Sequence, residues 1–353
     1  MGALKNIVAA TGLLAAAGIG ETVYFYNRTM KRGNAKTERT TKMSGTDWEK
    51  YFPLMEERKE YVMAQPHRDV YLTSFDGLKL HATYFPAAGA DQADGCEAGV
   101  ASGDGGEGTA DVCAAGSGAG KMVICFHGYT GEGLSNHIAI ADYFLKRGYA
   151  MLLPDARAHG ESEGEYIGFG CLDRRDALSW IRWAVRECGD GIKIMLHGTS
   201  MGGATVLMAS GLELPANVKG IVSDCGFTSP KEVFTHVLNH MYHLPAFPAI
   251  QGADLLNKKL AGYGMDECNA RREVRKAQVP ILFIHGSADT FVPCSMCHEI
   301  YDNCRSPKRK LIVEGAAHAE SYYKDMETYE RVLTEFADDI MSGQWEHDVS
   351  NTL

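Results

Sequence analysis

A serine between two glycines, directly after an apolar run, has the residue type and spacing of an activated nucleophile. Residues 192–197 have the composition of a buried strand, and residues 198–202 follow as Gly-Thr-Ser-Met-Gly. A serine at a sharp turn from strand to helix has a strained backbone, so the residues two positions away must be small. Gly198 and Gly202 meet this requirement. The pattern predicts that Ser200 lies at the N-terminus of the next helix, where backbone N–H groups favour negative charge.

An acid and a histidine follow Ser200 in the chain order that serine-dependent acyl transfer uses in one group of folds. Asp289 comes in the loop after the apolar run 281–285, and His318 comes in the loop after the run 310–314. Both residues therefore lie just beyond a predicted strand. In this arrangement Ser200 attacks an acyl carbon and His318 takes the serine proton, while Asp289 fixes the imidazole tautomer. The predicted reaction is acyl transfer to water.

The oxyanion of such a reaction needs two backbone N–H donors. Met201 supplies one of them, because it directly follows the serine. We expect Tyr129 to supply the other, since it lies in the loop after the predicted strand 122–126, next to Gly128. We interpret His127, in the same loop, as a structural histidine.

These residues resemble the α/β-hydrolase superfamily, and the resemblance covers about residues 69–340. It implies an α/β fold with a mostly parallel eight-stranded sheet flanked by helices and a helical lid insertion. Residues 127–129, 154–162 and 223–225 are similar to a bacterial group of membrane-anchored serine hydrolases. That group is allied to serine aminopeptidase-like and prolyl-oligopeptidase-like enzymes.

The resemblance also bears on four other residues. In some relatives the triad acid follows the strand that 218–224 would form, so Asp224 is a rival to Asp289. We favour Asp289, because its loop continues as the family's does. Arg157, His159 and Ser162 would brace the oxyanion loop and take no part in the chemistry.

The periodicity of apolar residues predicts alternating strands and helices. The expected strands are 69–75, 78–85, 122–126, 149–154, 192–197, 218–224, 281–285 and 310–314. The expected helices are 136–147, 174–187, 202–211, 295–303 and 322–341. Asp76-Gly77 between the first two strands is a strong signal for an antiparallel hairpin.

Two insertions interrupt this alternation. Residues 87–120 are rich in glycine, alanine and acidic residues and contain no basic residue, so we expect a disordered segment. Residues 227–279 contain helical stretches at 230–242 and 253–261, and we expect them to form a lid over the site. Four apolar lid residues at helical spacing would line an acyl pocket or pack on the sheet domain. They are Phe234, Val237, Leu238 and Met241.

The sequence predicts neither a metal nor a cofactor. His236, His240 and His243 share a helical face, but no acidic residue completes a familiar metal motif beside them. The cysteines are scattered through predicted strands and helices, which indicates free thiols in a reducing compartment. The formal net charge of −10 argues against a nucleic-acid partner.

The N-terminus has the composition of a membrane segment. Residues 7–26 are apolar except for Glu21, and several lysines and arginines follow. We expect an uncleaved single-pass anchor in the cell membrane, at 1–27, with the catalytic domain in the cytoplasm. A cleaved signal peptide is the alternative. A polar, partly helical linker at 28–66 and a hydrolase domain at 67–345 would follow.

Three functions remain open. The first is a serine hydrolase that cleaves a carboxylic ester, such as a lipid or a short acyl ester. The second is a peptidase or amidase of the aminopeptidase-like type, in which Glu232 or Asp254 would bind the substrate ammonium. The third is a non-catalytic binding module, which usually lacks a triad residue. The sequence does not identify the residues that bind the substrate.

Overall fold

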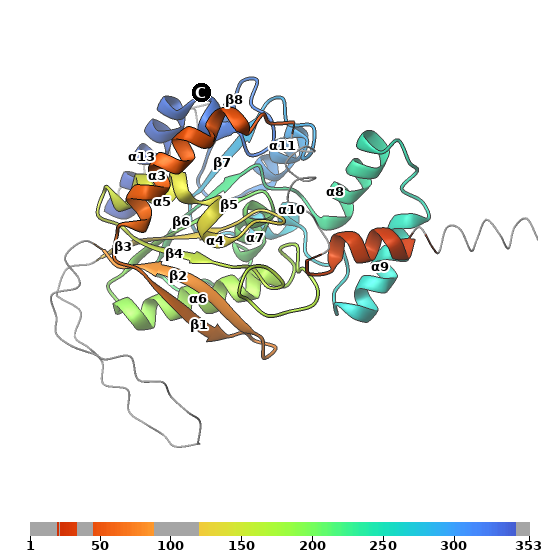
Figure 1. Ribbon diagram of the computed structural model, residues 1–353, viewed down its shortest axis with the longest axis horizontal. Coiled ribbons are helices and arrows are strands. Elements are labelled where there is room, and N and C mark those ends of the chain that lie inside the picture. Colours follow the sequence, from red (N-terminus) through yellow and green to blue (C-terminus); the bar gives the residue numbers. More distant parts are fainter. Residues whose placement is uncertain (1–19, 21, 34–44, 88–119, 344–353) are drawn as a thin grey trace, which may run out of the picture.

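An eight-stranded sheet forms the centre of the protein (Figure 1). The computed structural model describes residue 20 and residues 22–33, 45–87 and 120–343. The strands are β1 (Arg68–Thr73), β2 (Lys79–Phe85), β3 (Lys121–Phe126), β4 (Ala150–Pro154), β5 (Lys193–Thr199), β6 (Val218–Asp224), β7 (Ile281–Gly286) and β8 (Lys308–Val313). They are hydrogen-bonded in the order β1-β2-β4-β3-β5-β6-β7-β8. All eight predicted strands are present.

The sheet is mostly parallel, as predicted. β1 pairs with β2, and β2 pairs with β4, in antiparallel orientation, whereas every pair from β4 to β8 along the sheet is parallel. The carboxyl ends of the parallel strands therefore lie along one edge. Ser200, Asp224, Asp289 and His318 all lie at or just beyond those ends.

Helices cover both faces of the sheet. One face carries α3 (Phe52–Met63), α5 (Ile138–Leu145) and α13 (Met326–Ser342) (Figure 1). The other face carries α6 (Asp173–Cys188), α7 (Met201–Ala209), α10 (Ala270–Glu273) and α11 (Cys294–Asn303). The remaining short elements are η1 (Glu49–Tyr51), α4 (Gly133–Asn136), η4 (Val274–Lys276) and α12 (Ser321–Lys324).

The predicted helix 322–341 is interrupted. It is divided between α12 and α13, because the Asp325 backbone leaves the helical region with φ −141° and ψ 75°. The Asp325 side chain accepts a hydrogen bond from the Thr328 N–H at 3.1 Å and caps α13.

The side chains of β3 alternate between the two faces, as a strand buried on both sides requires. Met122, Ile124 and Phe126 pack in one apolar cluster, and Val123 and Cys125 pack in the other. All five side chains are buried. One such strand therefore joins both helical layers into a single core.

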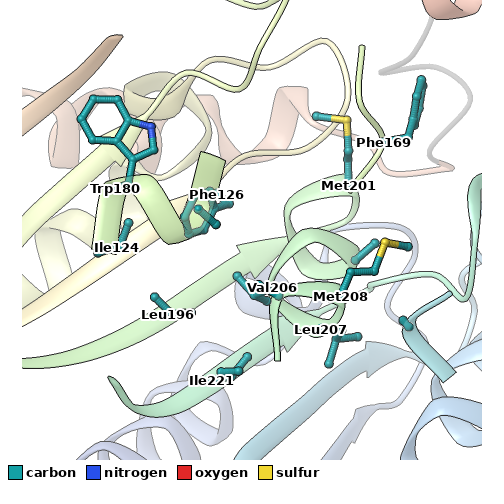
Figure 2. Close-up of a cluster of buried hydrophobic side chains, with 14 of the residues drawn as sticks. Ile124, Phe126, Phe169, Trp180, Leu196, Met201, Val206, Leu207, Met208 and Ile221 are labelled. Carbon is teal, nitrogen blue, oxygen red and sulfur yellow. The ribbon is translucent and has the colours of Figure 1, made fainter. Parts of the chain in front are cut away.

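Figure 2 shows the first of these clusters. Trp180 of α6 and Leu207 of α7 pack with Leu196 of β5 and Ile221 of β6. Trp180 is 1% exposed, and the other three are no more than 1% exposed. Burial of an aliphatic side chain of this size contributes about 1.5–3 kcal/mol. The cluster fixes α7, and with it the turn that carries Ser200, against the sheet.

The hairpin between β1 and β2 has a longer loop than Asp76-Gly77 alone predicts. Ser74 Oγ donates to Asp76 Oδ1 at 2.6 Å and accepts from the Leu78 N–H at 2.9 Å. The Phe75 ring lies against the Arg175 guanidinium, 3.4 Å from centroid to Cζ. These local contacts compete with strand pairing, so the loop extends from residue 74 to residue 78.

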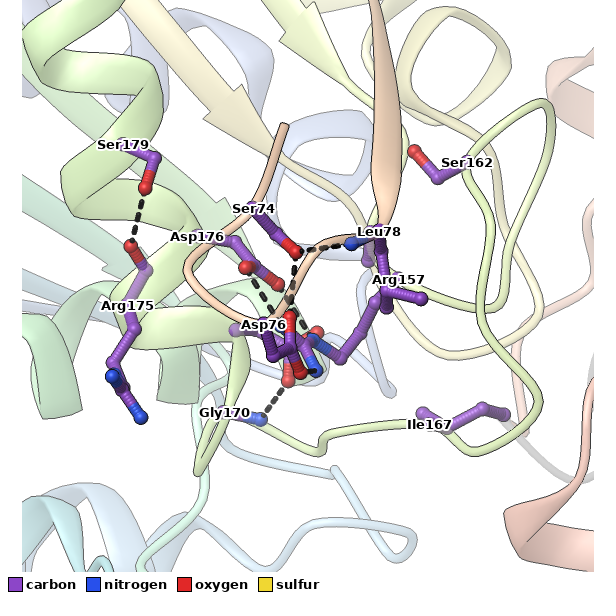
Figure 3. Close-up of polar contacts among 12 residues, drawn as sticks. Ser74, Asp76, Leu78, Arg157, Ser162, Ile167, Gly170, Arg175, Asp176 and Ser179 are labelled. Atoms are coloured by element: carbon purple, nitrogen blue, oxygen red, sulfur yellow. Dashed lines mark hydrogen bonds and ion pairs between the residues drawn. The ribbon is translucent and has the colours of Figure 1, made fainter. Parts of the chain in front are cut away.

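Arg157 connects this hairpin loop to α6 (Figure 3). Its guanidinium donates to both carboxylate oxygens of Asp176, at 2.7 and 2.8 Å, and to Asp76 at 2.8 and 3.2 Å. The Arg157 and Asp176 side chains are almost fully buried. Burial disfavours the charged guanidinium, but the two carboxylates raise the pKa of Arg157 above its usual value. Arg157 is therefore charged inside the protein, whereas burial raises the pKa of Asp176 to about 7 in spite of the guanidinium beside it.

Three segments lie together at one end of the molecule, beyond the strand ends (Figure 1). They are α8 (Pro230–His236) with its continuation η3 (Val237–Met241), α9 (Ala249–Leu260), and a helix at residues 22–30, which we call the N-terminal helix. The first two come from the predicted lid 227–279. The rest of that insertion returns to the body, since α10 contacts α7 and α11.

Two predicted segments fall largely outside the described residues. Residues 88–119 of the insertion 87–120 are among the undescribed ones, and so is most of the predicted anchor 7–26. Within the described ranges, every helix is too short or too polar to cross a bilayer. Residues 22–26 belong to the N-terminal helix, in which Thr22 and Tyr26 are buried against the protein. A membrane segment would therefore have to end before Thr22.

We expect Arg157→Ala to lower the free energy of unfolding by about 3–5 kcal/mol, because it leaves the buried Asp176 carboxylate without its partner. The measurement is urea unfolding of the whole chain. Arg331→Ala is the control, since Arg331 pairs with Glu335 on an exposed helix face, and we expect a loss below about 1 kcal/mol. Equal losses in the two variants would contradict a structural role for the Arg157 network.

Candidate functional site

The turn from β5 to α7 places Ser200 in a strained backbone conformation, with φ 56° and ψ −111°. The Ser200 N–H donates to the Asp224 carbonyl at 2.8 Å, which fixes the turn to the end of β6. A Cβ on Gly198 would lie 2.2 Å from the Gly202 carbonyl oxygen, and one on Gly202 would lie 1.8 Å from the Phe126 carbonyl oxygen. The two glycines are therefore required, as the sequence predicted.

Ser200, His318 and Asp289 form a continuous hydrogen-bonded chain. His318 Nε2 lies 2.8 Å from Ser200 Oγ, and His318 Nδ1 lies 2.7 Å from Asp289 Oδ2. All three residues are buried, with Ser200 7% exposed. An ionised carboxylate only accepts hydrogen bonds, so Nδ1 carries the ring proton and Nε2 accepts from the serine hydroxyl. The structure thus brings together the three residues that the sequence singled out.

The Asp289 carboxylate is held on both oxygens. Oδ1 accepts hydrogen bonds from the backbone N–H groups of Phe291 at 3.0 Å and Val292 at 2.9 Å. Oδ2 accepts from His318 and lies 3.3 Å from Nε2 of His285. Burial disfavours the charged carboxylate, but the neighbouring His318 and His285 hold the pKa of Asp289 well below its usual range. Asp289 is therefore an anion at neutral pH.

His285 is a member of this group that sequence reasoning missed. It is fully buried at the end of β7, and its Nε2 also donates to the Val292 carbonyl at 2.8 Å. Burial opposes protonation, yet contacts with Asp289 and Cys297 raise the pKa of His285 above its usual value. Its signal in the sequence was its spacing of four from Asp289 across a tight loop.

Among the described residues, the rival acid Asp224 makes no hydrogen bond to His318. Its Oδ2 accepts from the Tyr329 hydroxyl at 3.1 Å, and that hydroxyl also lies 3.1 Å from Nε2 of His197. Burial raises the pKa of Asp224 to about 6. The geometry therefore favours Asp289 as the partner of His318.

The loop after β3 faces Ser200, as predicted. A Cβ on Gly128 would lie 3.4 Å from the Ser200 Cβ, and Tyr129 lines the same cavity as Ser200. Asn136 Oδ1 accepts a hydrogen bond from the Gly128 N–H at 3.0 Å, which ties the loop to α4. Met201 is the first residue of α7, where N–H groups have no partner within the helix. Tyr129 and Met201, the residues expected to supply the two donors, thus both lie beside Ser200 in the fold.

Two neutral histidines support this loop. His127 Nε2 accepts from the Ala156 N–H at 2.9 Å, so its Nδ1 donates to the Gly128 carbonyl at 2.7 Å. Burial, together with His159, lowers the pKa of His127 to about 3. His159 Nε2 accepts from the Thr130 N–H at 3.4 Å. His127 is structural, and His159 braces the loop, as the sequence indicated.

The other two residues of the predicted brace act elsewhere. Ser162 Oγ donates to the Asp155 carbonyl at 2.7 Å and accepts from the His81 N–H at 2.9 Å, so it connects β2 to the end of β4. Arg157 holds the hairpin loop and α6. The side chains of both residues are therefore bonded to parts of the body other than the loop of Gly128 and Tyr129.

An apolar cavity of about 130 Å³ opens at Ser200. Of the four predicted lid residues, Phe234, Val237 and Leu238 line it, and Met241 does not. Sequence reasoning missed the aromatic residues of the body that complete its wall, of which Phe169 and Phe291 are examples. The Phe291 ring lies 4.9 Å from the His318 ring, centroid to centroid.

The two acidic lid residues considered as ammonium ligands are engaged elsewhere. Glu232 Oε1 accepts from Arg271 at 2.7 Å, and Asp254 accepts from Lys258 at 2.6 Å and from the Met265 N–H at 2.7 Å. Neither lines the cavity. Within the described ranges, the residues around this cavity include no carboxylate.

The three lid histidines do not converge on one point that a metal could occupy. The rings of His236 and His240 stack with their centroids 4.4 Å apart, and His236 Nε2 lies 2.9 Å from the Thr290 carbonyl oxygen. Elsewhere, Cys125, His137 and His197 bring ligand atoms within 4.8 Å of one another, and Cys225 does so with Asp289 and His318. The eight cysteines of the described ranges are all free thiols.

We expect Gly202→Ala to destabilise the protein by about 3 kcal/mol, at the upper end for overpacking, because the new methyl overlaps the Phe126 carbonyl. Chemical denaturation of the whole chain measures this loss. Gly20→Ala is the control, since no atom lies within 4 Å of its added Cβ. A Gly202→Ala protein as stable as the control would refute the close approach.

Family models agree with this geometry. A model described as alpha/beta hydrolase fold matches residues 121–248, and a model described as serine hydrolase (FSH1) matches residues 192–319. The uncharacterized protein YqkD of Bacillus subtilis is 31% identical over 219 residues, which cover 62% of this chain and 71% of YqkD.

Solved structures with the same fold include an esterase and a protein named Est1E. The Pyrococcus furiosus esterase Pf2001 aligns with a TM-score of 0.58 at 20% identity, over 78% of this chain and 92% of that one. Est1E from Butyrivibrio proteoclasticus, with ferulic acid bound, aligns with a TM-score of 0.55 at 17% identity, over 77% and 99% of the two chains. The sheet order, the strained turn at Ser200 and these similarities all point to one fold. The chain belongs to the α/β-hydrolase superfamily, and its match to a serine hydrolase model supports a hydrolase activity.

Proposed function

We propose that this protein is a serine hydrolase that cleaves carboxylic esters by way of an acyl-enzyme, with Ser200, His318 and Asp289 as its catalytic residues. The observation that carries the proposal is the hydrogen-bonded chain from Asp289 through His318 to Ser200, at the point where an apolar cavity opens. A nucleophile, a base in contact with it and an acid that orients the base are the parts that such a reaction needs.

The geometry supports a two-step mechanism. Ser200 Oγ attacks the ester carbonyl carbon while its proton moves to His318 Nε2, and Asp289 stabilises the imidazolium. The N–H groups of Met201 and Tyr129 would bind the oxyanion. His318 then gives its proton to the leaving alkoxide, and the alcohol departs. A water molecule repeats the sequence on the acyl-enzyme, which releases the acid and restores Ser200.

The cavity favours an ester over an aminoacyl substrate. An aminopeptidase-like enzyme needs an anion for the substrate ammonium, and a buried cation without a partner is costly. The described residues around the cavity are mainly aromatic and aliphatic and include no carboxylate. A non-catalytic binding module is less well supported, because Ser200, His318 and Asp289 are all present and hydrogen-bonded to one another in series.

We expect Ser200→Ala and Asp289→Asn each to lower kcat/KM for nitrophenyl esters by about a thousandfold or more. Asp224→Asn is the matched control: it makes the same change at a buried carboxyl, and the amide oxygen still accepts from Tyr329. We expect this variant to keep activity within about tenfold. Aminoacyl nitroanilides are assayed beside the esters.

The outcomes separate the alternatives. Loss in Asp224→Asn with retention in Asp289→Asn would assign the acid to Asp224. Turnover of anilides in preference to esters would favour the peptidase. Ester turnover that survives in Ser200→Ala would refute the proposal.

We also propose that the apolar residues before Thr22 anchor the protein in a membrane, with the catalytic domain on the cytoplasmic side. The apolar composition, and the basic residues Arg28, Lys31 and Arg32 after it, support this location. After expression in a bacterium, we expect the whole chain to stay with membranes through an alkaline carbonate wash. A chain that starts at Thr22 should be released. Release of the whole chain by the same wash would rule out the anchor.

A further inference from the structure

The N-terminal helix (22–30) is a wall of the cavity at Ser200. Thr22, Phe25, Tyr26, Arg28 and Thr29 all line the cavity together with the serine. Residues of α8, η3 and α9 also line the cavity. A segment that is distant from Ser200 in sequence thus lies over the bond-breaking site.

This helix is attached to the body along its whole length. The Tyr26 hydroxyl donates to Asn257 Oδ1 of α9 at 3.2 Å, and both residues are buried. The Met30 side chain is fully buried, and its carbonyl accepts from the Ile167 N–H at 2.9 Å. Arg32, just beyond the helix, donates to the Gly160 carbonyl at 2.6 Å.

The helix is also attached to the predicted oxyanion loop. The hydroxyl of Tyr129 donates to the Thr29 carbonyl at 2.9 Å. The helix therefore contacts, through one side chain, a residue whose N–H is a predicted oxyanion donor. The position of the helix therefore affects the shape of the cavity and the placement of the loop that carries Tyr129.

The faces of the helix are distinct. Thr22, Tyr26 and Met30 repeat every four residues and are buried, whereas Tyr24 is 58% exposed. Phe25 lines the cavity, and its ring lies edge-to-face with the Tyr242 ring of the lid, 6.0 Å between centroids. Phe25 and Tyr242 thus join the helix to the lid across the cavity.

We propose that the N-terminal helix and the lid together hold the acyl chain of the substrate, so that esters of aliphatic acids with a chain longer than that of acetate are preferred. This inference rests on the proposed ester hydrolysis at Ser200. An aliphatic chain fits because it gains free energy from burial against aromatic and aliphatic walls and needs no hydrogen-bond partner. The cavity is continuous with the Ser200 hydroxyl, so the chain extends from the carbonyl carbon into it.

Two variants of the whole chain test the proposal. Ala253→Phe adds bulk to a half-buried position of α9 that lines the cavity, and Phe25→Ala removes an aromatic wall. We expect both to lower kcat/KM for nitrophenyl dodecanoate by about tenfold or more. The value for nitrophenyl acetate, whose acyl chain is a single methyl group and gains little from burial, should change less than about twofold.

Exposed neighbours on the same helices supply matched controls. Leu255→Phe on α9 and Tyr24→Ala on the N-terminal helix alter side chains that are 68% and 58% exposed and do not line the cavity. We expect neither ester to be affected. An equal loss for acetate and dodecanoate in Phe25→Ala and Ala253→Phe would show a structural role only and would overturn the proposal.

A binding measurement keeps this test separate from the proposed function. In a Ser200→Ala background, we expect a fluorescent dodecanoic acid analogue to bind, and Phe25→Ala to weaken it by about tenfold. If no ester is cleaved but this selective binding is present, the proposed hydrolysis fails and the acyl-chain site stands. If Phe25→Ala and Tyr24→Ala bind the analogue equally, the acyl-chain site is wrong.

Discussion

The close approach of α7 to the end of β3 is the constraint on which the site depends. Gly202 lies so near the Phe126 carbonyl that any side chain would overlap it. This contact brings the β5–α7 turn and the loop after β3 together, because Phe126 is followed directly by His127, Gly128 and Tyr129. The strain at Ser200 persists only while surrounding structure over-determines its backbone. The buried cluster beneath α7, with Leu207 over β5 and β6, supplies that support.

The ionisation states of the buried groups near the triad place a negative charge on Asp289. Burial lowers the pKa of His137 to about 3 and that of His197 to about 4, so these two rings are neutral. Asp289 is the ionised group in contact with His318, and its charge is stabilised by two backbone N–H groups. A fixed anion on one side of His318 favours the imidazolium that forms when Ser200 loses its proton.

The sheet and the Ser200 turn were predictable from local signals, and the cavity was not. Apolar runs of five to seven residues mark buried strands, and the glycines beside Ser200 mark a turn with no room for side chains. The proposed role of Phe25 depends instead on contacts between segments far apart in the chain, and the contact of His285 with Asp289 depends on how the loop after β7 folds back. Apolar periodicity reports that a side chain is buried but does not report its partner. Phe234 and Met241 share the same helical spacing, yet Phe234 lines the cavity and Met241 does not.

The N-terminal helix shows that composition alone does not distinguish a membrane segment from a helix that packs on the protein. A helix that covers an acyl cavity must be apolar on the side that faces the substrate, and a membrane segment must be apolar all round. Residues 22–26 satisfy both descriptions in sequence, but the buried Tyr26 hydroxyl has a specific partner in Asn257. A bilayer core offers no such partner, so this hydroxyl identifies the segment as part of the protein interior. If the residues before Thr22 lie in a membrane, the cavity at Ser200 lies close to the lipid surface, because Thr22 itself lines that cavity.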